Sequence, residues 1–340
     1  MVCISVCIAA YNAEKFINDC LRSVASQTVQ PHEIVIVDDG SEVPLEIAAE
    51  ILGLFRSCRV RVIRTENNGP YAARRHAIEQ ATGDAVVCVD SDDELVDSHA
   101  LEKIVQGFDA GAEIVLYNAT TSKDNQSNSL DYKNLGSGGF VDKTTVWHEL
   151  ICGETLNSLC CKAFRKKCYL RHPGESDPRL LVSEDRLQSA EIIESAESIF
   201  LIDEPLYFYR SNSNSTINSV YNPDYYHQAC YVEGKLLHKI AGNEALVSEW
   251  AAFFLQYISA CILRYSRDYA DCTFKLKKKF YMSAVSEDVT RKALQYLDDA
   301  QMVLCDSIRI RMLASQKYRS LELSMLPWRL RDRLCTYFAK

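Results

Sequence analysis

Two short acidic turns contain the residues whose types and spacing could do chemistry. Asp38-Asp39-Gly40-Ser41 and Asp90-Ser91-Asp92-Asp93 each follow an apolar run typical of a buried strand. Carboxylates this close repel one another unless a positive group neutralises them. Mg2+ typically takes one or two carboxylates together with substrate phosphates, so the second turn favours a divalent cation, Mg2+ or Mn2+, that holds a diphosphate. The alternative is a solvated turn that caps a helix.

Two further groups are candidates for binding and for proton transfer. Arg74 follows the turn at residues 67–70 (NNGP), and an arginine near a helix start suits an anion or a planar base. Glu184 and Asp185 follow Ser183, which we expect to cap a helix. The carboxylate pair either complements the helix dipole or supplies a general base aimed into a crevice.

Apolar strands alternate with amphipathic helices over residues 1–117. Strands are expected at residues 2–10, 33–37, 60–63, 85–89 and 113–117, and helices after a cap at Asn12 and over 70–80 and 98–108. This alternation predicts an α/β fold with a mostly parallel central sheet covered by helices on both faces. Ligands of open parallel sheets bind beyond the carboxyl ends of the strands, so we expect both acidic turns to face one crevice.

The rest of the chain has a different pattern. Residues 118–140 are polar and are interpreted as a loop or a weak hairpin, and residues 142–220 are mixed, with a helix over 183–195 and a strand over 206–210. From residue 222 onward the spacing of apolar residues is helical. The sequence therefore predicts an α/β domain over 1–220 and an α-helical C-terminal extension over 221–340.

Composition excludes some classes of protein. The formal net charge of −8 argues against a nucleic-acid partner. The 14 cysteines include no CxxC pair, so we interpret them as small buried hydrophobic residues in a reducing cytoplasm. The N-terminus lacks a signal-peptide pattern, and the most apolar stretch, residues 250–263, is shorter than a membrane span. We expect a cytoplasmic location and a buried helix over 250–263.

A series of motifs in chain order resembles the family 2 glycosyltransferases, a large inverting group with the GT-A fold. The resemblance covers about residues 3–219. It is carried by residues 5–12 (SVCIAAYN), 21–28 (LRSVASQT), 33–41 (EIVIVDDGS), 68–74 (NGPYAAR), 81–84 (ATGD), 89–93 (VDSDD), 162–165 (KAFR), 184–185 (ED) and 207–210 (YFYR) with Ser215.

The resemblance implies a site for a nucleoside diphosphate sugar, with UDP the commonest nucleotide of the family. Asp90 and Asp92 would form the DxD element, with Asp92 the likelier ligand of Mn2+ or Mg2+, and Asp93 would orient the sugar. The remaining donor-binding residues that the resemblance implies are Ala9, Tyr11, Asp39, which would bond the base, and Arg74.

The resemblance also implies the reaction. Asp185 would be the general base, supported by Glu184, and the sugar would pass with inversion to a hydroxyl of a glycan or lipid-linked glycan in polysaccharide or glycolipid biosynthesis. Five residues depart from the family pattern and lie near the acceptor side, which leaves the acceptor open: Arg75, the pair Cys160-Cys161, Ser183 and Gln188.

The C-terminal residues 308–340 are rich in arginine with interleaved apolar side chains. One interpretation is a peripheral contact with the anionic inner face of a membrane. The other is a helix that packs on the catalytic domain or forms a homodimer contact.

The same residues bear on three other classes of protein. A binding module of the same fold, holding a nucleotide sugar or glycan without transfer, is the main alternative, and Asp90, Asp92 and Asp185 argue against it. A phosphoacceptor receiver domain would need a lysine after a late strand, where this chain has Asn118-Ala119. A dinucleotide oxidoreductase would need GxGxxG after the first strand, which is missing.

Overall fold

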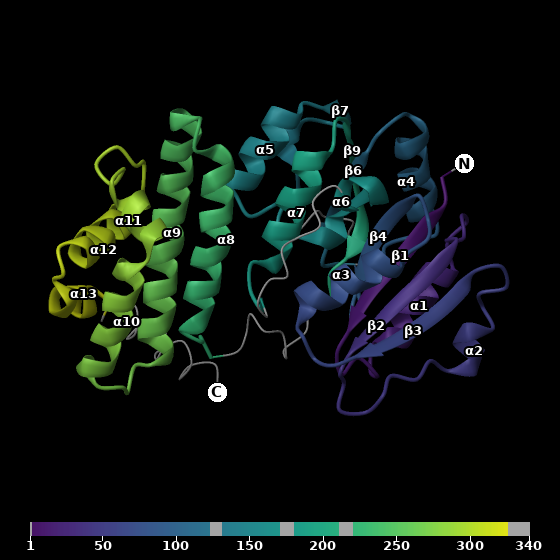
Figure 1. The fold of residues 1–340 in the computed structure, drawn as a ribbon, viewed down its shortest axis with the longest axis horizontal. Coiled ribbons are helices and arrows are strands. Elements are labelled where there is room, and N and C mark those ends of the chain that lie inside the picture. Colours follow the sequence, from purple (N-terminus) through teal and green to yellow (C-terminus); the bar gives the residue numbers. More distant parts are fainter. Residues whose placement is uncertain (1, 123–130, 171–179, 211–219, 326–340) are drawn as a thin grey trace. The chain divides into compact units, whose positions relative to one another are not determined.

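The chain forms two compact units, Met1–Asn212 and Ser213–Lys340. Figure 1 shows the first unit in purple to teal and the second in green to yellow. The computed structural model describes residues 2–122, 131–170, 180–210 and 220–325. Ser215 and residues 326–340 lie outside the described residues.

The first unit is built on a mixed sheet, in the order β3-β2-β1-β4-β8-β6-β9-β5, with β7 pairing to β9. The first half of the sheet is parallel: β1 runs parallel to β2 and β4, and β2 runs parallel to β3. These four strands are β1 (Ile4–Ala10), β2 (Glu33–Asp39), β3 (Arg59–Thr65) and β4 (Ala85–Asp90). Every residue of β2 is buried, as expected for a strand covered on both faces.

The second half of the sheet mixes directions. The strand β8 runs antiparallel to β4 and β6, whereas β9 runs parallel to β6 and antiparallel to β5 and β7. The strands are β5 (Glu94–Leu95), β6 (Ile114–Thr120), β7 (Gly139–Val141), β8 (Lys162–Arg165) and β9 (Ile199–Phe208). The predicted α/β class is confirmed, and the mostly parallel sheet is completed by antiparallel strands.

Helices connect these strands. The helix α3 packs on β1 and β2, and also contacts α7. The helices of the first unit are α1 (Ile17–Ala25), α2 (Ala49–Leu52), α3 (Pro70–Gln80), α4 (Ala100–Asp109), α5 (Lys143–Cys152), α6 (Lys166–Leu170) and α7 (Glu184–Ser195), with 3-10 turns at Lys133–Leu135 and Leu159–Cys161.

Two predicted helix caps are wrong. The helix α1 begins at Ile17 after Phe16, and Asn12 instead accepts a hydrogen bond from the Glu42 N–H at 2.9 Å. Ser183 does precede α7, but its side chain makes no cap hydrogen bond and its φ is 60°. Both residues have a left-handed backbone, with a φ of 50° at Asn12 and 60° at Ser183, whereas a capping residue usually has an extended one.

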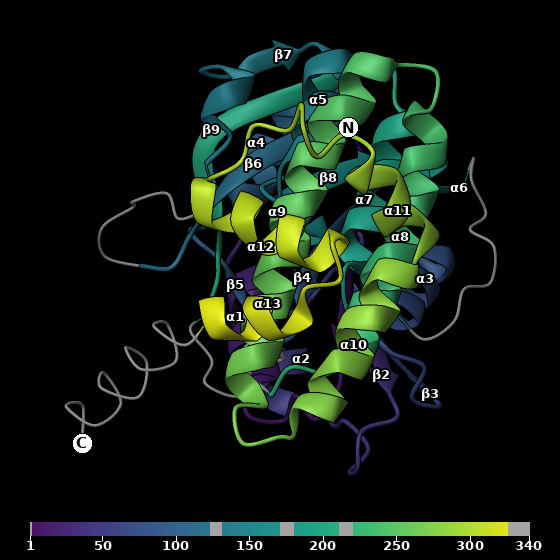
Figure 2. The same ribbon diagram turned by 90° about the vertical axis from the view of Figure 1, so that its left-hand side faces the viewer.

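The second unit is helical in its described part, as predicted. The helix α9 contacts α8, α11 and α12, and Figure 2 shows α12 crossing α9. The helices are α8 (Asp224–Ile240), α9 (Glu244–Asp268), α10 (Phe274–Ser286), α11 (Asp288–Leu294), α12 (Leu304–Ala314) and α13 (Tyr318–Ser324).

The helix α9 contains the predicted buried helix over 250–263 and is longer than that prediction. Of the helices in the described residues, only α9 is long and apolar enough to cross a membrane by length and composition, and half of its most apolar window is buried. Trp250, Phe254 and Ile258 are fully buried, and the Trp250 indole donates to Glu233 at 2.7 Å. These contacts are those of a core helix, so the length and composition of α9 are weak evidence for a membrane span.

Candidate functional site

The two acidic turns lie side by side at the carboxyl ends of parallel strands. In the sheet register, Ala9 near the end of β1 is opposite Val37 on β2 and Asp90 on β4, and Ala10 is opposite Asp38. The turn after β2 and the turn after β4 therefore flank the end of β1. This is the edge of the sheet at which the sequence placed a ligand.

Asp38 fixes the shape of the first turn. Its carboxylate accepts hydrogen bonds from the Ser41 N–H at 3.0 Å and the Leu45 N–H at 3.1 Å, and pairs with Arg64 at 2.8 Å. Burial raises the pKa of Asp38, but these donors outweigh it and lower the pKa below its usual value. Gly40 has a φ of 70°, and a Cβ there would lie 2.6 Å from the Asn67 nitrogen, so the turn requires glycine.

Asp39 joins the first turn to the start of α3. Its two oxygens accept the N–H groups of Asn68 and Gly69, each at 2.9 Å, and the residue is 4% exposed. Gly69 has a φ of 88° and precedes Pro70 at the first helical position. These two hydrogen bonds fix the orientation of the Asp39 carboxylate, and its bond to a base stays a prediction. Tyr11, also expected at the nucleoside, is 52% exposed.

Asp93 is an internal anchor of the second turn. Its oxygens accept the Tyr207 hydroxyl and the Arg210 N–H, each at 2.8 Å, and the Tyr207 oxygen accepts the Asp90 N–H at 3.1 Å. Burial and the neighbouring Asp90 raise the pKa of Asp93 to about 7 against these hydrogen bonds, which lower it. A role in orienting the sugar stays a prediction for Asp93.

Arg210 holds the same turn from outside. Its Nε donates to the Asp92 carbonyl at 2.9 Å, and its guanidinium pairs with Glu94 at 2.5 Å and with Asp19 at 3.4 Å. The guanidinium also lies 5.2 Å from the centroid of the Phe16 ring. The sequence placed Arg210 in a motif but gave it no role, because its partners lie far away in the chain.

Arg74 gathers three carboxylates from two sides of the site. Its guanidinium pairs with Asp90 at 3.0 Å, with Glu184 at 3.1 Å and with Asp185. The side chain of Arg74 is 10% exposed, and those of Glu184 and Asp185 are 12% and 25% exposed. The Arg74 Nε has no hydrogen-bond partner in the described residues. Arg74, which was predicted to bind the nucleotide, is thus the ion-pair partner of Asp185, the predicted general base.

The environment of Asp185 suits a group that exchanges a proton near neutral pH. Burial raises the pKa of Asp185 to about 7; Arg74 opposes this rise, and Glu184 and Asp90 add to it. Lys162 also lowers it, but the Lys162 ammonium is fully buried and donates to the Leu156 carbonyl and the Ser189 hydroxyl, each at 2.9 Å. Arg74 is therefore the cation that contacts Asp185 directly in the described residues.

The acidic turns fit a divalent cation by the chemistry of their donors. One guanidinium faces three carboxylates, so the cluster keeps a net negative charge, and Asp92 adds a carboxylate on a partly exposed residue. In the described residues no three carboxylates of this region bring their oxygens within 4.8 Å of one another. An ion here would have one or two protein ligands and substrate oxygens for the rest, as Mg2+ commonly does.

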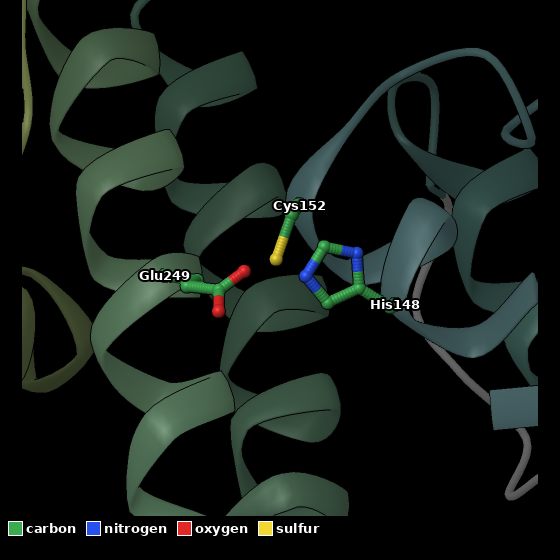
Figure 3. A group of neighbouring side chains, drawn as sticks. All are labelled: His148, Cys152 and Glu249. Carbon is green, nitrogen blue, oxygen red and sulfur yellow. The ribbon is translucent and has the colours of Figure 1, made fainter. Parts of the chain in front are cut away.

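A separate pair of metal-binding residue types lies on α5. His148 and Cys152 are one turn apart (Figure 3), and Glu249, drawn with them, belongs to α9 of the second unit. Two protein ligands are fewer than the three or four of a zinc site. We assign no metal site to α5.

Comparison with known proteins identifies the family. Residues 5–171 match the family described as Glycosyl transferase family 2. The chain is 27% identical over 221 residues to a glycosyltransferase named EpsH from Bacillus subtilis, covering 63% of this chain and 62% of that protein. It is 34% identical over 133 residues to the glycosyltransferase GlyG from Streptococcus pneumoniae, covering 38% and 43%. The chain thus spans less than two thirds of the length of these relatives.

Solved structures show the same fold. The chain resembles S. aureus TarS 1-349 in complex with UDP, with a TM-score of 0.66, 18% identity and coverage of 96% of this chain and 91% of that one. For the complex of TarS 1-349 with UDP-GlcNAc the TM-score is 0.62 and the identity 18%, with coverage of 96% and 92%. The expected architecture, a GT-A-like domain followed by helices, is confirmed. Residues 5–171 thus form a domain of glycosyl transferase family 2, and the N-terminal part of the chain is that of a glycosyltransferase.

Proposed function

We propose that the first unit transfers a sugar from a UDP-sugar to an acceptor hydroxyl with inversion at the anomeric carbon. The observation that carries this proposal is the cluster in which Arg74 joins Asp90 of the acidic turn to Glu184 and Asp185 on α7. A donor-side carboxylate and a candidate base with a pKa of about 7 thus share one cation. We assign the catalytic domain to residues 1–220 and the helical extension to 221–340.

The donor side rests on the turns after β2 and β4. Asp39 would bond the base, Ala9 and the exposed Tyr11 would border the nucleoside, and Asp90 and Asp92 would contact the ribose and the diphosphate. A UDP-sugar is favoured because TarS, which shares the fold, is known in complex with UDP and UDP-GlcNAc. Mn2+ or Mg2+, with Asp92 as its protein ligand, would neutralise charge on the leaving diphosphate.

The acceptor side rests on Asp185. Asp185 takes the proton of the attacking hydroxyl as the hydroxyl oxygen bonds to the anomeric carbon from the face opposite the leaving group. Glu184 shares Arg74 with Asp185 and so holds the guanidinium in place. Arg74 would act here through Asp185 and Asp90, and its predicted contact with the nucleotide would need the carboxylates to rearrange.

The wider setting is also a proposal. A glycan or lipid-linked glycan acceptor, a cytoplasmic location and a peripheral contact with the inner membrane face through residues 308–340 would fit together. The described part of that segment packs into the second unit, because Ile310, Leu313 and Leu321 are fully buried and Arg309 pairs with Asp306. A homodimer is tested by light scattering of the purified chain.

The proposed function is tested first by thermal shift with UDP-, GDP- and dTDP-sugars, in Mn2+ or in EDTA. A ligand that binds the native state raises the melting temperature by mass action. We expect metal-dependent stabilisation by UDP-sugars, followed by release of UDP in the presence of acceptor and a product of inverted anomeric configuration by NMR. No shift with any nucleotide sugar would reject the donor site, and a product of retained configuration would reject direct displacement.

A further inference from the structure

A face of α10 in the second unit is strongly basic. Lys275, Lys278 and Lys279 are exposed and lie at helical spacing on one side of α10. The opposite side packs into the unit through Phe280, Tyr281 and other buried residues. The exposed side of α10 therefore presents three cations and no acid.

The helix α13 extends this face. Lys317 and Arg319, at its start, are exposed. The Lys278 ammonium lies 5.9 Å from the centroid of the Tyr318 ring, and the Arg319 guanidinium lies 5.8 Å from the centroid of the Phe274 ring. These cross-contacts place cations of both helices on one surface. We call it the basic face: Lys275, Lys278, Lys279, Lys317 and Arg319.

No carboxylate of residues 220–325 forms an ion pair with a residue of the basic face. Glu322, the acid on α13, is turned inward to Lys277 at 3.3 Å and to the Tyr281 hydroxyl. The side chains of Lys277 and Glu322 are 3% and 14% exposed. This buried pair neutralises itself, so the field of the exposed lysines is left uncompensated.

Large apolar side chains lie on the same two helices and point to solvent. Leu276 is 44% exposed, Met282 is 52% exposed, and Leu323 on α13 is 64% exposed. Lysines mixed with exposed leucine and methionine are the composition of a surface that rests on a lipid headgroup layer. A partner that is a soluble anion would gain nothing from these apolar groups.

The charge of the whole chain supports a local role for this face. Residues 271–340 contain 14 Lys+Arg and 8 Asp+Glu, whereas the full chain has a net charge of −8. The sequence that follows α13 contains Arg329, Arg331 and Arg333, with Trp328 and Leu330 beside them. An anionic surface would therefore meet this end of the second unit and be repelled by the rest of the chain.

We propose that the basic face of α10 and α13 docks the protein on the surface of a bilayer that contains anionic phospholipid. The lysines and Arg319 meet the headgroup phosphates, and Leu276, Met282 and Leu323 enter the boundary between headgroups and acyl chains. This surface is independent of sugar transfer, lies within the described residues, and includes α10, which the sequence did not single out.

The test is cosedimentation of the full chain with vesicles of phosphatidylcholine alone or with phosphatidylglycerol. We expect binding to the anionic vesicles only, and release by high salt. Each basic residue near such a surface contributes to the free energy of membrane binding. Replacing Lys275, Lys278 and Lys279 by glutamine should therefore weaken partitioning about 100-fold. Donor-induced thermal shift should stay unchanged in this variant.

A matched control removes the same charge elsewhere. The control variant carries glutamine in place of Lys239 on α8 and of Arg291 and Lys292 on α11. It should bind the anionic vesicles as the unaltered chain does. Equal loss in the control would reduce the effect to net charge and overturn the proposal. It is also overturned if the chain binds neutral vesicles equally, binds neither, or loses binding only when Arg329, Arg331 and Arg333 are replaced by glutamine.

Discussion

Replacement of Asp185 by asparagine should abolish transfer and stabilise the fold at the same time. The carboxyl group has a pKa of about 7 in the folded chain against the ordinary value of 3.8. Ionising Asp185 therefore costs the folded state progressively as the pH rises from about 4 to about 7. Asparagine never ionises and can still accept a hydrogen bond from Arg74.

The size of the effect follows from the shift in pKa. At 1.36 kcal/mol per unit, the shift corresponds to a gain of up to about 4 kcal/mol in the free energy of unfolding above pH 7. Below about pH 4 the Asp185 carboxyl is protonated, so both the unaltered and the asparagine side chains are neutral. The gain in the free energy of unfolding should then vanish. Urea unfolding of the two proteins at pH 4 and pH 8 measures this difference directly.

The control is Asp109→Asn, because Asp109 is an exposed residue at the end of α4. It should change unfolding little at either pH, since isolated surface charges contribute little. An Asp185→Asn protein that is no more stable at pH 8, or that gains equally at pH 4, would refute the buried-base reasoning. Retained transfer would refute the role of Asp185 itself.

Three further outcomes are expected. The ratio kcat/KM should rise with pH around a midpoint near 7, since only the ionised base accepts a proton. At pH 6 it should be about tenfold lower than its plateau value at high pH. A flat profile from pH 5 to 9 would count against Asp185. Asp92→Ala should lose Mn2+-dependent stabilisation by UDP-sugars in thermal shift while keeping its melting temperature without ligand, and unchanged metal dependence would remove Asp92 from the ion. Arg74→Met should lower the free energy of unfolding by about 3–5 kcal/mol, because it leaves buried carboxylates unpaired. Arg75→Met, which breaks the partly exposed pair with Glu79, should cost well under 1 kcal/mol, and equal losses would contradict the cluster.

The regular elements could be predicted because their signals are local. Strand periodicity and the Gly69-Pro70 pair place β1, β4 and α3 nearly where the structure has them, and α3 spans Pro70–Gln80 as predicted. The strand expected over 206–210 is the end of β9, which begins at Ile199. Sequence periodicity did not show this longer strand because it pairs with β5, β6 and β7, which lie earlier in the chain.

The hydrogen bonds and ion pairs of the site could be predicted only in part. The strand ends and the family motifs brought Asp39, Asp90 and Asp185 to one edge of the sheet, but not their partners. Arg74 lies 111 positions from Asp185, and Tyr207 lies 114 positions from Asp93. Such pairs depend on the finished fold. For the same reason the sequence assigned Arg74 to the nucleotide, although its nearest anions belong to the protein.

The hydrogen bonds of Asp39 determine which substitutions the first acidic turn tolerates. Asp39 binds the main chain of residues 68 and 69, so the first acidic turn depends on backbone shape and not on the side chain of Asn68. Gly69, by contrast, has a left-handed φ, and a Cβ there would lie 3.3 Å from the Leu180 carbonyl. Substitutions at position 68 other than proline, which would remove the N–H donor, should therefore change this turn little, whereas Gly69 does not tolerate replacement. The first acidic turn can therefore change its exposed side chains without changing its backbone shape. The cluster around Arg74 cannot, because side chains make its ion pairs.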